Sequence, residues 1–136
     1  MKRVLIIDDD PDHHKLLGLF LKTRNYQCSY LLEGSETLKV IRDFQPDIII
    51  LDIMMPGLTG RTIYDGIRDE FGYCMPIIVC SGLKMSFKRI KDNLIDYCPK
   101  PVDLDVLEKK LNKLMEASEK CRNKPVEKEV DSGKKR

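Results

Sequence analysis

The sequence lacks the features of several specialised protein classes. No apolar run approaches the roughly 18–20 residues that a membrane-spanning helix needs. Neither sign of charge dominates, because the chain has 24 basic and 22 acidic residues and a net charge of +2. A nearly neutral chain argues against a dedicated nucleic-acid binder, which would present a basic face. The apolar part of the start, MKRVLIIDDD, is too short for a signal peptide.

The five cysteines are odd in number and unclustered. A disulfide framework in a small secreted domain shows an even number of cysteines, and a zinc site shows closely spaced ones. Most of the cysteines here lie in apolar stretches instead. We therefore expect reduced thiols in the core of a cytosolic protein. The residues concerned are Cys28, Cys74, Cys80, Cys98 and Cys121.

Short apolar runs alternate with amphipathic segments along the 136 residues. Runs without polar residues are typical of parallel strands that are covered by helices on both faces, and the segments between them carry apolar stripes at helical spacing. Five repeats of strand and helix predict an α/β fold, a doubly wound parallel sheet with right-handed crossovers. The expected strands are 4–7, 27–31, 48–51, 77–80 and 96–98.

Particular residues mark the expected boundaries. Pro11 can begin the first helix because its missing N–H would be unpaired there, and Ser35 is the expected N-cap of the second helix. The last helix is expected over about residues 102–120. We take residues 1–120 as one domain. Residues 121–136 are highly charged and have little apolar surface to bury, which predicts a flexible tail.

Polar residues gather where the expected strands end. In an open parallel sheet the carboxyl ends of the strands meet at one edge, where ligands bind. Carboxylates about 4 Å apart repel by about 4 kcal/mol per pair at an effective dielectric near 20. A cation relieves that repulsion, and an all-oxygen site with room for water suits Mg²⁺. The strand-end residues are Asp8, Asp9, Asp10, Asp52, Ser81 and Lys100.

Asp52 is the best candidate nucleophile in this set. It stands alone at a strand end and faces the acidic residues, and an aspartate carboxylate can form a covalent aspartyl phosphate. The ammonium of Lys100 and the hydroxyl of Ser81 would each bind one phosphate oxygen. The residues therefore predict a site that holds a phosphoryl group on Asp52 with the help of Mg²⁺.

Four segments resemble the receiver domain of two-component response regulators, in a stand-alone, chemotaxis-regulator-like form. The resemblance covers roughly residues 2–120 and rests on IIDDDP, PDIIILDIMMPGLTG, PIIVCSG and DYCPKP. It implies a flavodoxin-like sheet of order 2-1-3-4-5 with five helices. It also implies a phosphoacceptor, not an enzyme, whose donor is a histidine kinase or a histidine phosphotransfer protein. Such a domain is cytoplasmic and acts by changed binding to a downstream protein, with no nucleic acid or membrane partner expected.

The resemblance also implies a role for individual residues. Asp8 and Asp9 take the places of the family's acidic pair, Asp9 binding Mg²⁺ directly and Asp8 through water. The main-chain carbonyl of Met54 is a further expected ligand. Ser81 takes the hydroxyl switch position, and Tyr97 the aromatic switch position, three residues before the family's lysine.

The chain departs from the family pattern between Ser81 and Lys100. The segment is about one helical turn shorter than usual, and Asn93-Leu94 replaces the usual Gly-Ala. We expect the fourth helix, near residues 86–94, to be short or irregular. This leaves two alternatives open for Tyr97, a moving switch or plain packing.

Other functions remain as alternatives. A phosphohydrolase of the haloacid-dehalogenase type also uses a strand-end aspartate, and Asp8-Asp9-Asp10 satisfies its first motif. Against it, no two adjacent acidic residues follow Lys100 and no cap domain fits. A phosphoryl adduct on Asp8 would favour the hydrolase and one on Asp52 the receiver, whereas an inactive receiver-shaped interaction module would form no adduct. The chain is either a whole gene product or a receiver fragment of a longer regulator.

Two neighbouring histidines remain outside this scheme. His13 and His14 lie in the first expected helix, where adjacent side chains point about 100° apart and make a poor metal-binding pair. We expect both at the surface.

Overall fold

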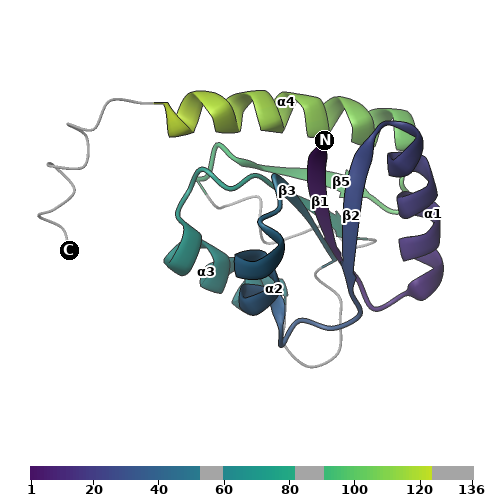
Figure 1. Ribbon diagram of the computed structural model, residues 1–136, viewed down its shortest axis with the longest axis horizontal. Coiled ribbons are helices and arrows are strands. Elements are labelled where there is room, and N and C mark those ends of the chain that lie inside the picture. Colours follow the sequence, from purple (N-terminus) through teal and green to yellow (C-terminus); the bar gives the residue numbers. More distant parts are fainter. Residues whose placement is uncertain (53–59, 82–90, 124–136) are drawn as a thin grey trace, which may run out of the picture.

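The computed structural model describes residues 1–52, 60–81 and 91–123. Within these ranges strands and helices alternate as far as β4, and β5 and a long final helix follow (Figure 1). In chain order the elements are β1 (Lys2–Ile7), α1 (Pro11–Thr23), β2 (Tyr26–Leu31), α2 (Thr37–Phe44), β3 (Ile48–Asp52), α3 (Gly60–Phe71), β4 (Ile77–Ser81), β5 (Ile95–Pro99) and α4 (Leu104–Arg122).

The five strands form one parallel sheet in the order β2-β1-β3-β4-β5, which confirms the expected topology. The register aligns the strand ends. Ile7 lies opposite Leu31 on one side and Leu51 on the other, and Asp52 lies opposite Cys80. The polar residues that follow these positions therefore emerge at the same edge of the sheet.

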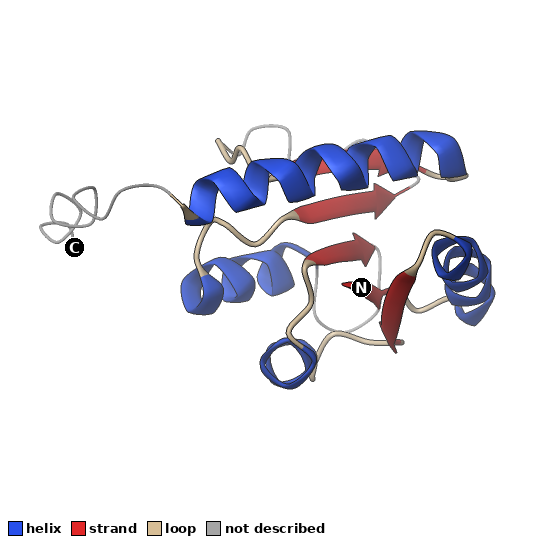
Figure 2. Ribbon diagram, turned by 45° about the horizontal axis from the view of Figure 1, so that its top comes forward, coloured by secondary structure: helices blue, strands red, loops and turns tan. Residues whose placement is uncertain are grey.

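Helices cover both faces of the sheet (Figures 1 and 2). Because successive side chains of a strand point to opposite faces, β1 contributes to two cores. Val4 and Ile6 pack with apolar residues of α1 and α4, whereas Leu5 and Ile7 pack with those of α2 and α3. Every residue of β3 and β4 is buried, as expected for strands that are apolar up to their last residue.

The described residues contain four of the five expected helices. The helix expected near 86–94 falls mainly on 82–90, outside the described residues. Residues 93–94 form a turn that leads into β5. The final helix α4 ends at Arg122, and the tail expected for 121–136 lies outside the described residues from position 124. No helix in the described ranges is long and apolar enough to cross a membrane.

The start of α1 is as expected and that of α2 is not. Asp10 is the N-cap of α1, since its side chain accepts a hydrogen bond from the Asp12 N–H at 2.9 Å, and Pro11 is the first helical residue. The expectation for Ser35 was wrong. The helix α2 has Glu36 at its N-cap position without a side-chain cap, because the Ser35 hydroxyl donates to Glu33 instead, at 2.7 Å.

The expectation of five reduced cysteines was wrong for one pair. Cys74 and Cys121 form a disulfide with 5.5 Å between their Cα atoms. They are 47 residues apart in the sequence, and the end of α4 brings Cys121 to the α3–β4 loop that contains Cys74. The other three cysteines are free thiols, of which Cys80 and Cys98 are buried.

Candidate functional site

Three carboxylates meet at the carboxyl edge of the sheet. Asp8 and Asp9 directly follow β1, and Asp52 ends β3. One carboxylate oxygen from each lies within 4.8 Å of the others. Asp8 and Asp52 are only 2% and 4% exposed, while Asp9 is exposed. The convergence expected from the strand ends is therefore present.

Lys100 bridges the two buried carboxylates. It directly follows β5, and its Nζ lies 3.2 Å from Asp8 Oδ2 and 3.3 Å from Asp52 Oδ2. Burial alone would lower the pKa of the Lys100 ammonium, but the charges of Asp8 and Asp52 outweigh burial and raise it above the ordinary value. Lys100 is therefore a cation at neutral pH, and it balances part of the negative charge.

Asp8 is saturated with hydrogen-bond donors. Its Oδ1 accepts from the Asp10 N–H at 3.0 Å, and its Oδ2 lies 2.5 Å from His13 Nδ1 in addition to Lys100. Burial alone would raise the pKa of Asp8, but the bonds from His13 and Asp10 and the charge of Lys100 hold it well below the ordinary value. Since an ionised carboxylate only accepts hydrogen bonds, His13 Nδ1 is the donor.

The surface position expected for the two histidines was wrong. The His13 side chain is only 12% exposed, and His14 is buried and stacks on Tyr30 with 5.2 Å between the ring centroids. Burial lowers the pKa of His14. Only three residues separate β1 from α1, so the first turn of the helix lies directly over the strand end. That short connection is the signal in the sequence that would have placed His13 beside Asp8.

Ser81 and Tyr97 lie on the neighbouring strands. Ser81 ends β4, is 6% exposed, and accepts a hydrogen bond from the Lys100 N–H through its main-chain carbonyl at 3.1 Å. The Tyr97 ring packs with the apolar residues between the sheet and α3. Its hydroxyl is buried and has no hydrogen-bond partner among the described residues, and burial raises its pKa. Met54, the other expected ligand, lies outside the described residues.

The residues of this edge fit a divalent cation. They offer hard oxygen ligands, which Mg²⁺ prefers, and the exposed Asp9 leaves one side open to water, which Mg²⁺ retains when it binds proteins. The single ammonium of Lys100 does not balance three carboxylates. A bound cation would remove the remaining repulsion.

The fold and the site together define a parallel α/β domain with an acidic, lysine-bridged edge. The chain matches the family model described as the response regulator receiver domain over residues 4–112. It therefore belongs to the receiver domains of two-component response regulators.

Solved structures of receiver domains share this fold. A response regulator receiver domain protein (CheY-like) from Methanospirillum hungatei superposes with a TM-score of 0.79 at 22% identity, covering 88% of this chain and 98% of that one. The response regulator protein TrrA from Thermotoga maritima, solved in complex with Mg(2+)-BeF, has a TM-score of 0.72 at 31% identity, covering 84% and 99%.

Curated relatives are longer than this chain. The regulatory protein VanR of Enterococcus faecium is 37% identical over 102 residues, which is 73% of this chain and 43% of VanR. The sensor histidine kinase RcsC of Escherichia coli is 31% identical over 123 residues, which is 88% of this chain and 13% of RcsC. The similarity therefore concerns one domain of each of these proteins.

Proposed function

We propose that this domain accepts a phosphoryl group on Asp52 and signals by a changed affinity for a downstream protein. The observation that carries the proposal is the position of Asp52, which is buried at a strand end, bonded to Lys100 and close to two further carboxylates. Aspartate in such a setting can act as a nucleophile. The domain is then a phosphoacceptor and not an enzyme with a separate substrate.

Asp8 is poorly placed to act as the nucleophile. Both Asp8 oxygens already accept hydrogen bonds, from the Asp10 N–H on one side and from His13 and Lys100 on the other. Lone pairs engaged in this way are less available for attack. A haloacid-dehalogenase-type reaction, which would need Asp8 as the nucleophile, is therefore disfavoured by this geometry.

The transfer step forms a bond from an Asp52 carboxylate oxygen to phosphorus as the bond from phosphorus to the donor breaks. Lys100 can exchange its contact with Asp52 for one with a transferred phosphate oxygen, and Ser81 lies on the adjacent strand to bind another. Mg²⁺, held by Asp8, Asp9, Asp52 and the Met54 carbonyl, would supply charge neutralisation. The Mg(2+)-BeF complex of TrrA, which is 31% identical to this chain, supports that choice of cation.

Ser81 and Tyr97 are the proposed switch residues. A phosphoryl group on Asp52 would attract the Ser81 hydroxyl, and a displacement of Ser81 would reach the adjoining strand β5 through its register with Pro99. Tyr97 lies two residues earlier on β5 and buries a hydroxyl without a partner among the described residues. A buried hydroxyl without a hydrogen-bond partner lowers its free energy when it finds a new partner or reaches solvent. This favours Tyr97 as a residue that moves.

The proposed phosphoryl donor is a sensor histidine kinase or a histidine phosphotransfer protein, and the proposed location is the cytoplasm, where kinases find ATP. RcsC, itself a sensor histidine kinase, contains the segment that this chain matches, which supports a kinase partner. We propose no nucleic acid or membrane partner for the domain, since its chain is nearly neutral.

The test is phosphorylation by a small donor. The protein is incubated with acetyl phosphate and Mg²⁺, and its intact mass and the position of the adduct are measured. We expect one adduct on Asp52, lost in Asp52→Asn and after chelation of the cation. Asp43→Asn is the matched control, since Asp43 is an exposed carboxylate on α2. An adduct on Asp8, or none on the wild-type protein, would reject the proposal.

A further inference from the structure

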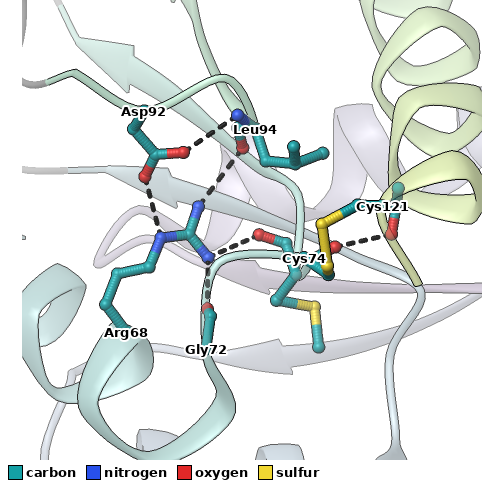
Figure 3. Close-up of a disulfide and its surroundings, with 8 residues drawn as sticks. Arg68, Gly72, Cys74, Asp92, Leu94 and Cys121 are labelled. Atoms are coloured by element: carbon teal, nitrogen blue, oxygen red, sulfur yellow. Dashed lines mark hydrogen bonds and ion pairs between the residues drawn. A yellow bond between two sulfur atoms is a disulfide. The ribbon is translucent and has the colours of Figure 1, made fainter. Parts of the chain in front are cut away.

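The disulfide lies far from the phosphoryl-acceptor site in the sheet. Cys74 belongs to the loop between α3 and β4, and Cys121 to the last turn of α4. Both residues are half-buried, and we therefore expect a reductant to reach the bridge. Cys80 and Cys98, in contrast, are 0% and 1% exposed. Figure 3 shows the bridge between the two segments.

The loop that carries Cys74 is held in place without the sulfur bridge. The Arg68 guanidinium donates to the carbonyl oxygens of Gly72 at 3.0 Å and Met75 at 2.7 Å, one on each side of Cys74. The same guanidinium pairs with Asp92 at 2.8 Å (Figure 3). We therefore expect Cys74 to stay in place when the bridge is lost.

The end of α4 has a second contact with the same loop. The Ser118 hydroxyl donates to the main-chain carbonyl of Cys74 at 2.6 Å, and Ser118 is 4% exposed. Ser118 lies three residues before Cys121, so both lie on one face of the helix. This hydrogen bond keeps the two cysteines adjacent when the disulfide is open.

We propose that Cys74 and Cys121 are a reversible thiol–disulfide site, which links the end of α4 covalently to the α3–β4 loop when oxidised and leaves the two joined only by the weaker Ser118 hydrogen bond when reduced. The reactant is a dithiol. One of its thiolates attacks a sulfur of the bridge and expels a cysteine thiolate, and its second thiol then resolves the mixed disulfide. Two electrons and two protons pass to Cys74 and Cys121, and the dithiol becomes a disulfide.

Two arguments favour reversible exchange over a permanent bridge. The two thiols stay close after reduction, so closure is effectively intramolecular and needs no rearrangement of the fold. In addition, disulfides in a reducing cytosol are usually transient, catalytic or redox-sensing; only this second argument rests on the cytoplasmic location in the proposed function. The site is independent of Asp52.

The test is a redox titration of the folded wild-type protein. Samples are equilibrated in buffers of graded reduced to oxidised dithiothreitol and alkylated, and each cysteine is quantified by peptide mass spectrometry. We expect Cys74 and Cys121 to become labelled together as the buffer becomes reducing, and to lose the label on re-oxidation. Cys80 and Cys98 should stay unlabelled until denaturant is added. Circular dichroism of the same samples should show a folded protein throughout.

Two results would overturn the proposal. One is labelling of Cys74 and Cys121 in every buffer, which would mean that no bridge forms. The other is protection of both until the protein unfolds, which would mean a fixed structural bridge. Acetyl phosphate treatment of the same samples measures Asp52 separately, so a failure there bears on the proposed function alone.

A variant of Ser118 tests the contact that keeps the thiols adjacent. In Ser118→Ala the re-oxidation of the reduced pair should be about two- to tenfold slower, the range of a single net hydrogen bond. Ser29→Ala, on β2, is the matched control with unchanged re-oxidation. Hydrogen exchange should also become faster on reduction at residues 118–122, and not in β1 or β3. Equal rates for Ser118→Ala and wild type would reject the role of this hydrogen bond.

Discussion

Buried charges serve opposite purposes at the two edges of the sheet. Near the start of β4 and β5, Arg68 pairs with Asp92, and the side chains are 3% and 0% exposed. Charge is balanced there, and further bonds reach the guanidinium and the carboxylate from main-chain groups and from the Tyr64 hydroxyl. At the carboxyl edge three carboxylates lie together, and among the described residues the ammonium of Lys100 contacts two of them, Asp8 and Asp52.

The comparison separates a network that stabilises the fold from one that needs a ligand. A buried, fully hydrogen-bonded ion pair stabilises the fold against mutation of either partner. Removing one partner leaves the other charge buried without a counter-charge in a medium of low dielectric, which costs free energy. The repulsion within an unbalanced cluster of carboxylates falls when a cation binds or when one of the carboxylates is chemically modified. Stability and proposed function thus depend on different ends of the same strands, which mutation and titration can test.

The largest expected effect comes from breaking the balanced network. Arg68→Met leaves the Asp92 carboxylate buried without its cation and should lower the free energy of unfolding by about 3–5 kcal/mol. Urea denaturation measures the loss. Arg42→Met is the matched control, because Arg42 pairs with Glu70 at the surface, with side chains 52% and 34% exposed, and should lose less than about 1 kcal/mol. Equal losses in the two variants would contradict the comparison.

Reduction of the bridge, at the same end of the molecule, should have the next largest effect. A cross-link over a 47-residue separation restricts the unfolded chain, and its removal should lower the free energy of unfolding by about 2–4 kcal/mol. Urea denaturation with and without dithiothreitol measures the change. Cys74→Ser should match the reduced wild-type protein and be insensitive to reductant. A reductant effect that persists in this variant would assign the loss to another group.

A change at the unbalanced edge should have the opposite sign. Asp52→Asn removes one of three mutually repelling charges while its amide oxygen can still accept from Lys100, so it should raise the free energy of unfolding by about 1 kcal/mol in the presence of a chelator. Mg²⁺ should reduce this difference because it binds the folded wild-type protein. Denaturation of both proteins with Mg²⁺ and with chelator checks both effects. A loss as large as that of Arg68→Met would mean that the two edges do not differ.

The last expected effect is a titration in the balanced network. Burial, and then the hydrogen bond to Asp92, raise the pKa of Tyr64 to about 12, against an ordinary value near 10. The favourable contribution of neutral Tyr64 is therefore complete below about pH 10 and is lost as the pH rises towards the folded-state value. Tyrosinate absorbance, wild type minus Tyr64→Phe, should show a transition near pH 12. A midpoint at the ordinary value would place Tyr64 outside the network.

The sheet and much of the candidate site could be predicted because each depends on a local signal. Strands buried on both faces are apolar until their last residue, as β3 and β4 are, and this pattern is visible in a short window. The convergence of Asp8 and Asp52 with Lys100 follows from the rule that parallel strands end at one edge.

The remaining contacts have no local signal. Arg68 and Asp92 are 24 residues apart, and Cys74 and Cys121 are 47 apart. Each pair depends on how far a helix extends and which loop its end reaches. His13 was misplaced for a different reason, because the signal for its position over Asp8 is the three-residue length of the β1–α1 connection and not the residue types within it.

The way α4 is attached determines which part of this helix would be displaced by a small shift at the carboxyl edge of the sheet. The helix begins shortly after Lys100, and its 19 residues span about 28 Å at about 1.5 Å per residue. The far end of the helix is attached to Cys74, so the helix would tilt about that end. A shift of about 1 Å at its first turn would tilt it by only about 2°. The largest displacement would fall on its first turns, so a partner that senses the tilt would bind there.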